Sequence, residues 1–392
     1  MIQRTLSPRE RVLTALNLQT PDRVPVDFLA TPEIWQKLVE YYKPDVSRIP
    51  TTDYYDSEWE AVLQELQVDC RVISYDQFCA PPESMLREDS QVEWWNVLSR
   101  STPNRMWRQQ SENGEFYDIW GRHFRIAENP TGAYEELASW PLCSASNVDE
   151  LKSFLWPDPD WWDFDQIPEL LNSMNNSREY HIRFRIGSVF EVAWQLRGMQ
   201  EFLMDLALNP EIPEYIMDRL TDVYVENTRR VLEIAGDQLD MVYFYDDVAT
   251  QESLMISSNM WEKYIRPRHQ KLIDVAKAYD VPVMYHCDGA VYSLIPDLID
   301  MGVVVLNPIQ SDAAGMDPQK LKHEFGDQLS FHGGVDIIDT LPNGTVEDVK
   351  QEVENLIRIL GENGGYIMAS SHHIQSNTPI ENVLGMYDLS IR

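Results

Sequence analysis

Basic residues, cysteines and long apolar runs are all scarce in this sequence. Its 32 Lys and Arg stand against 64 Asp and Glu, which gives a net charge of −32. This balance argues against nucleic-acid binding, because such binding needs a basic surface that displaces counterions. No run approaches the roughly 18 to 20 consecutive apolar residues of a membrane helix. These shortages exclude two broad classes of partner, nucleic acids and membranes.

The lack of a signal-peptide pattern and the small number of cysteines indicate the cellular compartment. The opening residues Met1-Ile2-Gln3-Arg4 lead into a helix signal without the apolar stretch of a signal peptide. Only four cysteines occur in 392 residues, which suits a reducing compartment better than a disulfide scaffold. We therefore expect a cytoplasmic protein.

Strand and helix patterns alternate from residue 180 onward. This order is typical of a parallel sheet with helical crossovers. No glycine-rich nucleotide-binding fingerprint follows any strand, which disfavours an open nucleotide-binding sheet. We therefore predict an α/β fold, a (β/α)8 TIM-type barrel that forms a single domain over residues 1–392. The predicted strands are 181–186, 240–246, 281–286, 303–307, 329–333 and 365–370, and the predicted helices are 198–208, 212–235, 259–278, 292–301, 318–325 and 345–361.

The N-terminal half begins with a helix signal and is then interrupted. Ser7, Pro8 and Glu10 have the spacing of a helix start with a capping box, and residues 24–28 form a short apolar strand pattern. Eight of the twelve tryptophans fall in residues 84–165, which are rich in proline and lack a long amphipathic period. Within them, 105–125 alternates around Asn113-Gly114, a strong hairpin signal. We predict an irregular, Trp- and Pro-rich excursion that could cap the barrel mouth.

Polar side chains are concentrated where the predicted strands end. Active sites of such barrels lie at the C-terminal ends of the strands. Side chains alternate along a strand, so His286 and Asp288 should share one face while Cys287 faces the other way. Two imidazoles with a carboxylate would suit zinc, iron or manganese, with His372 or His373 as the third ligand. The simpler alternative is that Asp288 caps the next helix and His286 is a hydrogen-bonded core residue. Histidines or paired carboxylates end four strands: Tyr245-Asp246-Asp247, His286-Cys287-Asp288, His332-Gly333-Gly334 and Ser371-His372-His373.

Two arginines share one face of the strand predicted at 181–186. Arg183 and Arg185 alternate with apolar residues, so both side chains should point the same way. On the barrel interior they could bind an anionic group of a substrate. An internal ion pair with a carboxylate on a neighbouring strand explains them equally well.

Taken in order, several short motifs resemble the uroporphyrinogen decarboxylase-like superfamily. The resemblance runs nearly end to end and is closer to the cobamide-dependent methyltransferase branch than to the decarboxylase. True decarboxylases bind their substrate through an arginine-rich N-terminal motif, whereas the matching residues 25–30 of this sequence contain no arginine. The motifs that carry the resemblance are Ser7-Pro8-Arg9-Glu10-Arg11-Val12-Leu13, Pro21-Asp22-Arg23-Val24-Pro25-Val26, Asp118-Ile119-Trp120-Gly121, Pro157-Asp158-Pro159-Asp160, Asp246-Asp247, His286-Cys287-Asp288-Gly289, Gly333-Gly334-Val335-Asp336 and Thr378-Pro379-Ile380-Glu381-Asn382.

The resemblance implies a metal site, with a change of ligands. Methyltransferases of this branch hold zinc with a His-x-Cys pair and a distant Cys, and the zinc activates a thiol. His286 matches the histidine, whereas Asp288 and His372 stand where the two cysteines would be. The site thus changes from one nitrogen and two sulfurs to two nitrogens and one oxygen, which is harder and more Lewis-acidic. That change puts thiol methylation in doubt without removing the metal.

These observations lead to one functional hypothesis with two alternatives. We expect a metal-dependent enzyme that moves a methyl group between a corrinoid protein or methylated small molecule and an acceptor. Zinc is the first expectation for the metal, and a partner protein would supply any corrinoid. The alternatives are a decarboxylase or lyase acting on a small acid, and a non-catalytic corrinoid or tetrapyrrole binder. The expected site residues are His286, Asp288 and His372 as metal ligands, Asp247 and His332 as fourth ligand or general base, and Arg183, Arg185 and Tyr245 for substrate.

Overall fold

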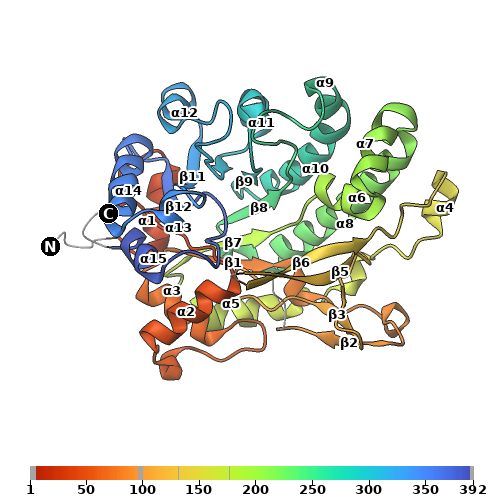
Figure 1. Cartoon of the computed structure of the whole chain (residues 1–392), viewed down its shortest axis with the longest axis horizontal. Helices are drawn as coiled ribbons and strands as arrows, with labels where there is room; N and C mark the ends of the chain where they lie inside the picture. The colour runs from red at the N-terminus through yellow and green to blue at the C-terminus, as the bar shows by residue number, and fades with distance from the viewer. Residues whose placement is uncertain (1–5, 96–99, 131, 176, 389–392) are drawn as a thin grey trace.

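Seven parallel strands form the central sheet of the molecule (Figure 1). The computed structural model describes residues 6–95, 100–130, 132–175 and 177–388. Residues 1–4, on which the expected absence of a signal peptide partly depends, lie outside this range. All six strands predicted after residue 180 are present, with ends that differ by at most two residues. In spatial order, the strands are β1 (Cys70–Ser74), β7 (His181–Arg185), β8 (Met241–Tyr245), β9 (Val283–His286), β10 (Val305–Asn307), β11 (Ser330–Val335) and β12 (Tyr366–Ser370).

The segment around Val26 closes this sheet into a barrel. Val26 forms a parallel bridge with Met368 of β12. On its other side, the Asp69 N–H donates to the Val26 carbonyl at 2.9 Å, directly before β1. The strand predicted at 24–28 therefore takes the eighth position, although it is paired only by short bridges. The predicted TIM-type α/β fold is confirmed.

Helices connect the strands and surround them (Figure 1). The predicted capping box is present, because Ser7 accepts from the Glu10 N–H and Glu10 bonds back to Ser7. The helix predicted at 259–278 is divided by a π-helical turn, Trp261–Ile265. No helix in the described part of the chain is both long and apolar enough to span a membrane. The helices are α1 (Pro8–Leu16), α2 (Pro32–Tyr42), α3 (Ser57–Glu65), α4 (Val148–Lys152), α5 (Ile167–Asn175), α6 (Phe190–Arg197), α7 (Met199–Leu208), α8 (Glu211–Ala235), α9 (Ser258–Met260), α10 (Arg266–Lys277), α11 (Ile295–Met301), α12 (Pro318–Phe325), α13 (Thr340–Asn343), α14 (Val346–Leu360) and α15 (Ile380–Met386).

The excursion carries a second, antiparallel sheet. The predicted hairpin joins β3 to β4: Gly114 has φ +84°, and the Ser111 N–H donates to the Glu115 carbonyl at 2.9 Å. Side chains of this region, Met106 and Phe124 among them, line the same cavity as residues from the barrel strands. The excursion therefore forms one wall of the barrel mouth. Its strands are β2 (Ser90–Glu93), β3 (Arg108–Ser111), β4 (Phe116–Tyr117), β5 (His123–Asn129) and β6 (Gly132–Ser139).

Asp69 holds three parts of the chain together at the opposite end of the barrel. Its carboxylate is fully buried and pairs with Arg11 of α1 at 2.5 Å and with Arg23 at 2.7 Å. It also accepts the Val26 N–H at 2.8 Å. One carboxylate thus ties the first helix and the eighth strand position to the start of β1.

We predict that Asp69→Ala lowers the free energy of unfolding by about 3–5 kcal/mol, because it leaves two buried guanidinium groups without their shared counter-charge. Urea unfolding would measure the loss. Asp89→Ala is the matched control: the exposed Asp89–Arg87 pair should contribute less than about 1 kcal/mol. A similar, small loss in both variants would contradict the structural role of Asp69.

Candidate active site

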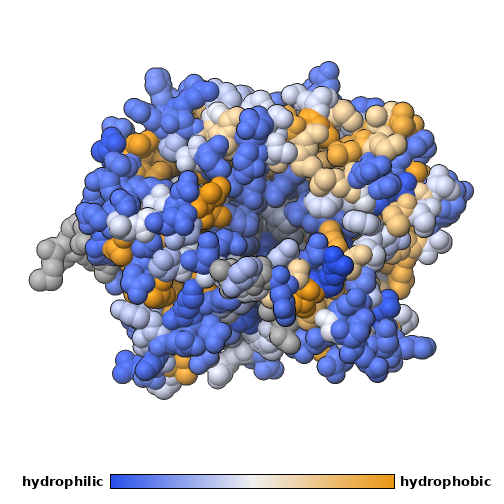
Figure 2. Space-filling model, viewed as in Figure 1, coloured by the Kyte–Doolittle hydropathy of each residue, from blue (hydrophilic) through white to orange (hydrophobic). Residues whose placement is uncertain are grey.

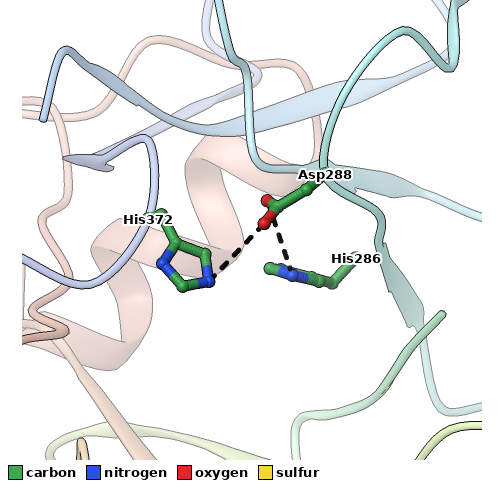
Figure 3. Close-up of side chains that lie close together, drawn as sticks. All are labelled: His286, Asp288 and His372. Atoms are coloured by element: carbon green, nitrogen blue, oxygen red, sulfur yellow. Dashed lines mark ion pairs between the residues drawn. The ribbon is translucent and has the colours of Figure 1, made fainter. Parts of the chain in front are cut away.

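Three of the side chains singled out in the sequence converge at the C-terminal rim of the barrel (Figure 3). His286 ends β9, Asp288 lies in the loop after it, and His372 follows β12. One ligand atom from each lies within 4.8 Å of the others. His286 Nε2 is 3.7 Å from Asp288 Oδ1, and His372 Nε2 is 3.6 Å from Asp288 Oδ2. Parallel strands bring these residues to one rim although 84 positions separate Asp288 from His372.

The donor atoms of this group fit a cation. Asp288 Oδ1 is buried and has no hydrogen-bond partner in the described structure. A buried carboxylate oxygen without a donor is costly unless a positive charge is nearby. The two imidazoles face this carboxylate from either side (Figure 3). Two nitrogens and one oxygen form a donor set suited to zinc, iron or manganese.

Cys287 lies in the core, as the alternation along the strand predicts. Its side chain is fully buried, and its Sγ accepts the Val248 N–H at 3.3 Å. Burial raises the pKa of this thiol well above its ordinary value.

A buried hydrogen-bond chain orients His286. His286 Nδ1 donates to Asn307 Oδ1 at 2.5 Å, and Asn307 Nδ2 donates to His332 Nδ1 at 2.6 Å. His332 Nε2 in turn donates to Asp27 Oδ2 at 2.9 Å. Because the Asp27 carboxylate can only accept, it fixes the tautomer of His332, then the amide of Asn307, then the tautomer of His286. The chain leaves the lone pair of His286 Nε2 free toward Asp288.

Arg183 completes this chain from the barrel interior. Its guanidinium bonds to Asp27 Oδ2 and lies 3.3 Å from His332 Nε2. Burial would raise the pKa of Asp27, but Arg183 and His332 together hold it well below its ordinary value. Burial lowers the pKa of His332, so this imidazole is neutral near pH 7. His332, expected as a fourth ligand or base, thus lies in an internal chain and outside the converging group.

The other expected site residues line the same cavity. Arg185 pairs with Asp76 at 2.7 Å, so both arginines of β7 form the internal ion pairs that were the alternative to substrate binding. Asp247 lies beside the converging group: its Oδ1 accepts the Asp288 N–H at 2.8 Å and is 3.9 Å from His286 Nε2. Burial raises the pKa of Asp247 and of the Tyr245 phenol.

The cavity has a volume of about 320 Å³. Figure 2 shows a hollow on this face, bordered mainly by hydrophilic side chains. Burial and the neighbouring carboxylates act in opposite directions on the pKa values of the two histidines in the converging group. Asp288 and Asp247 outweigh burial and raise the pKa of His286, whereas burial prevails and lowers the pKa of His372. The cavity is lined by Leu29, Val72, Tyr75, Asp76, Ser101, Met106, Arg108, Arg122, Phe124, Glu135, Arg183, Arg185, Glu191, Tyr243, Tyr245, Asp247, Met284, His286, Asn307, His332, His372 and His373.

Glu191 was not singled out from the sequence, yet it lines this cavity. Burial, aided by Asp247, raises the pKa of Glu191 to about 7. An acidic residue in the first turn of a helix usually stabilises the helix dipole, so its sequence position is unremarkable. The one available signal was its place just after a barrel strand, on the rim where active sites lie.

Comparison with known proteins places the chain in a family. The model of the family described as "Uroporphyrinogen decarboxylase (URO-D)" matches residues 173–390, more than half of the chain. A methylated-thiol–coenzyme M methyltransferase of Methanosarcina mazei is 24% identical over 236 residues, covering 58% of this chain and 59% of that protein. The methylcobamide:CoM methyltransferase MtbA of Methanosarcina acetivorans is 23% identical over 209 residues, covering 52% and 56%. The chain thus spans somewhat over half the length of these two curated relatives.

A solved structure supports the same assignment at the level of the fold. A methyltransferase from Methanosarcina mazei superposes with a TM-score of 0.62 at 19% identity, covering 97% of each chain. The motifs, the closed barrel and the family match agree: this chain belongs to the uroporphyrinogen decarboxylase (URO-D) family.

Proposed function

We propose that this protein is a metal-dependent methyltransferase. It would move a methyl group between a corrinoid protein or a methylated small molecule and an acceptor bound in the cavity. The observation that carries this proposal is the convergence of His286, Asp288 and His372 on one rim, with a buried Asp288 oxygen that lacks a partner. The names of the two curated relatives, both methyltransferases, support the type of reaction.

In this proposal His286, Asp288 and His372 hold the metal. A bound zinc, iron or manganese ion would act as a Lewis acid on the acceptor or leaving atom. The protein contributes orientation: Asn307 fixes the His286 tautomer, and the buried Asp27–Arg183 pair fixes Asn307 through His332. Asp247 remains the candidate for a fourth ligand or a base, because its Oδ1 lies 3.9 Å from His286 Nε2. A partner protein would carry the corrinoid.

The cavity size bears on the two alternatives. At about 320 Å³ it is near the lower end of the roughly 300–1,000 Å³ range of ligand pockets. That suits a small substrate better than an entire tetrapyrrole, so it disfavours a tetrapyrrole binder and a porphyrin decarboxylase. A lyase acting on a small acid would use the same metal group to polarise a carboxylate. Production of CO₂ without methyl transfer would identify the lyase.

The metal site gives the first prediction of this proposal. Wild-type protein should bind about one transition-metal ion per chain, and His286→Ala or His372→Ala should abolish that binding. Elemental analysis after incubation with zinc, iron and manganese in turn would measure it. Cys287→Ser is the matched control: it should keep its metal and lose on the order of 1 kcal/mol of stability. Wild-type protein that retains none of the three metals would refute the site.

The orienting chain gives the second prediction. Asn307→Leu should weaken metal affinity by about 10–100-fold, because His286 loses the acceptor that fixes its tautomer. Competition with a chromophoric chelator would measure the affinity. Thermal unfolding without metal would show whether the variant remains folded. Unchanged affinity in a folded variant would mean that the chain does not orient the ligand.

The change of ligands gives the third prediction. Wild-type protein should methylate simple thiols poorly with methylcobalamin, because an oxygen ligand donates less electron density to the metal than a thiolate does. Asp288→Cys combined with His372→Cys should raise zinc affinity and thiol turnover, within the limit that Zn–S bonds, at about 2.3 Å, are longer than Zn–O or Zn–N. Vigorous thiol methylation by the wild type would show that the new ligands did not change the chemistry.

A further inference from the structure

Glu191 lines the cavity from α6, a helix that contacts the excursion through the bond between Gln195 and Arg122. It lies in the first turn of α6, directly after β7, and its N–H donates to Asp246 Oδ1 at 2.8 Å. It shares the cavity lining with Asp247 and His286. A group placed there can contact a substrate that is bound at the candidate metal site.

Hydrogen bonds fix which oxygen of Glu191 can carry a proton. Gln195 Nε2 donates to Glu191 Oε1 at 2.8 Å. The opposite end of that amide, Gln195 Oε1, accepts from Arg122 Nη1. A guanidinium can only donate, so Arg122 fixes the amide with its NH2 group toward Glu191. Oε1 is therefore engaged as an acceptor, and Oε2 has no hydrogen-bond partner in the described part of the chain. Any proton on this carboxyl group therefore lies on Oε2.

Glu191 also lacks an ion-pair partner, unlike its neighbours. In the described structure no Lys, Arg or His nitrogen pairs with it, whereas Asp76 and Asp27 each pair with an arginine. Burial and Asp247 together raise its pKa to about 7, so both protonation states are populated near neutrality. The charged or titratable groups that face it are Arg122 from the excursion, Tyr245, Asp246 and Asp247 after β8, and His286 from β9.

We propose that Glu191 is a catalytic acid and base that exchanges a proton between Oε2 and a hydroxyl oxygen of the substrate. This inference rests on the proposed methyl transfer and specifies its substrate class as an O-methyl compound or the corresponding alcohol or phenol. The harder donor set of the candidate metal site favours an oxygen atom at the reacting position. An alkoxide or phenoxide is also a poorer leaving group than a thiolate, so its departure benefits from a proton.

In transfer from a methyl ether, the bond between the methyl carbon and the oxygen breaks, and an external acceptor such as a reduced corrinoid would supply the electron pair of the new bond to that carbon. The broken bond's electron pair stays on the oxygen, which takes the proton from Glu191 Oε2. Glu191 is left as a carboxylate and regains a proton from water. In the reverse direction the carboxylate removes the proton from the attacking hydroxyl.

A pair of probes separates acid catalysis from a structural role. Metal-loaded wild type and Glu191→Gln would be compared with cob(I)alamin as acceptor and anisole or 4-nitroanisole as methyl donor. Glu191→Gln should slow transfer from anisole by about 10²–10⁴-fold. It should slow transfer from 4-nitroanisole far less, because nitrophenolate leaves readily without a proton. The wild-type rate with anisole should fall as pH rises through about 7, and Glu191→Gln should lose this dependence, while Glu191→Asp restores part of both. Equal slowing of both probes, or an unchanged anisole rate, would overturn the proposal.

An infrared measurement tests Glu191 independently of turnover. A protonated carboxyl band should be present in metal-loaded wild type at about pH 6, titrate near neutrality, shift when phenol binds, and be absent in Glu191→Gln. If neither probe is demethylated but this band behaves as expected, the proposed methyl transfer fails and the proton-exchanging role of Glu191 stands. If the band is absent, or phenol does not shift it, the inference about Glu191 is wrong whatever the enzyme transfers.

Discussion

A buried chain of hydrogen bonds crosses the barrel interior from Arg183 through Asp27, His332 and Asn307 to His286. Each link determines the next, because a guanidinium only donates, a carboxylate only accepts, and the imidazoles and the amide in between have one consistent orientation. The groups are desolvated, so a mismatched link would leave a buried polar atom unpaired at a cost of about 1–3 kcal/mol. The direction of the His286 lone pair is therefore set by the Asp27–Arg183 ion pair, to which His286 is connected through Asn307 and His332.

The same chain links the site to the closure of the barrel. Asp27 belongs to the segment that occupies the eighth strand position through the bridge of Val26 with Met368. Its carboxylate reaches His332 on β11 and Arg183 on β7, two strands on different sides of the interior. A segment that pairs only weakly through its backbone is thus held by side chains, and the rim geometry depends on its position.

Two parts of the chain, the barrel and the excursion, supply the residues that line the cavity. The barrel strands and the loops after them supply the converging group and the hydrogen-bond chain that orients it, whereas the excursion adds Met106, Arg108, Phe124 and Glu135 to the cavity lining. The family match begins at residue 173, after the excursion. In the proposed function, substrate selection can therefore vary with the excursion while the metal group stays the same. Glu191 lies in α6, directly after the barrel strand β7 and within the family match. This position fits a role in the reaction rather than in substrate selection.

The sequence by itself determined the barrel strands after residue 180, the hairpin at Asn113-Gly114 and the opposite orientations of His286 and Cys287. These features follow from local rules: alternation along a strand, turn chemistry and the polar C-terminal ends of parallel strands. The strand-end pattern left His372 and His373 open as the third residue, and the family resemblance selected His372. The tertiary structure alone decided that Arg183 is neutralised by Asp27, 156 positions away, and that Gln195 and Arg122 leave one oxygen of Glu191 free. Such pairings depend on which segments the closed barrel brings together. No periodicity in the sequence shows which residues, far apart along the chain, will meet in this way.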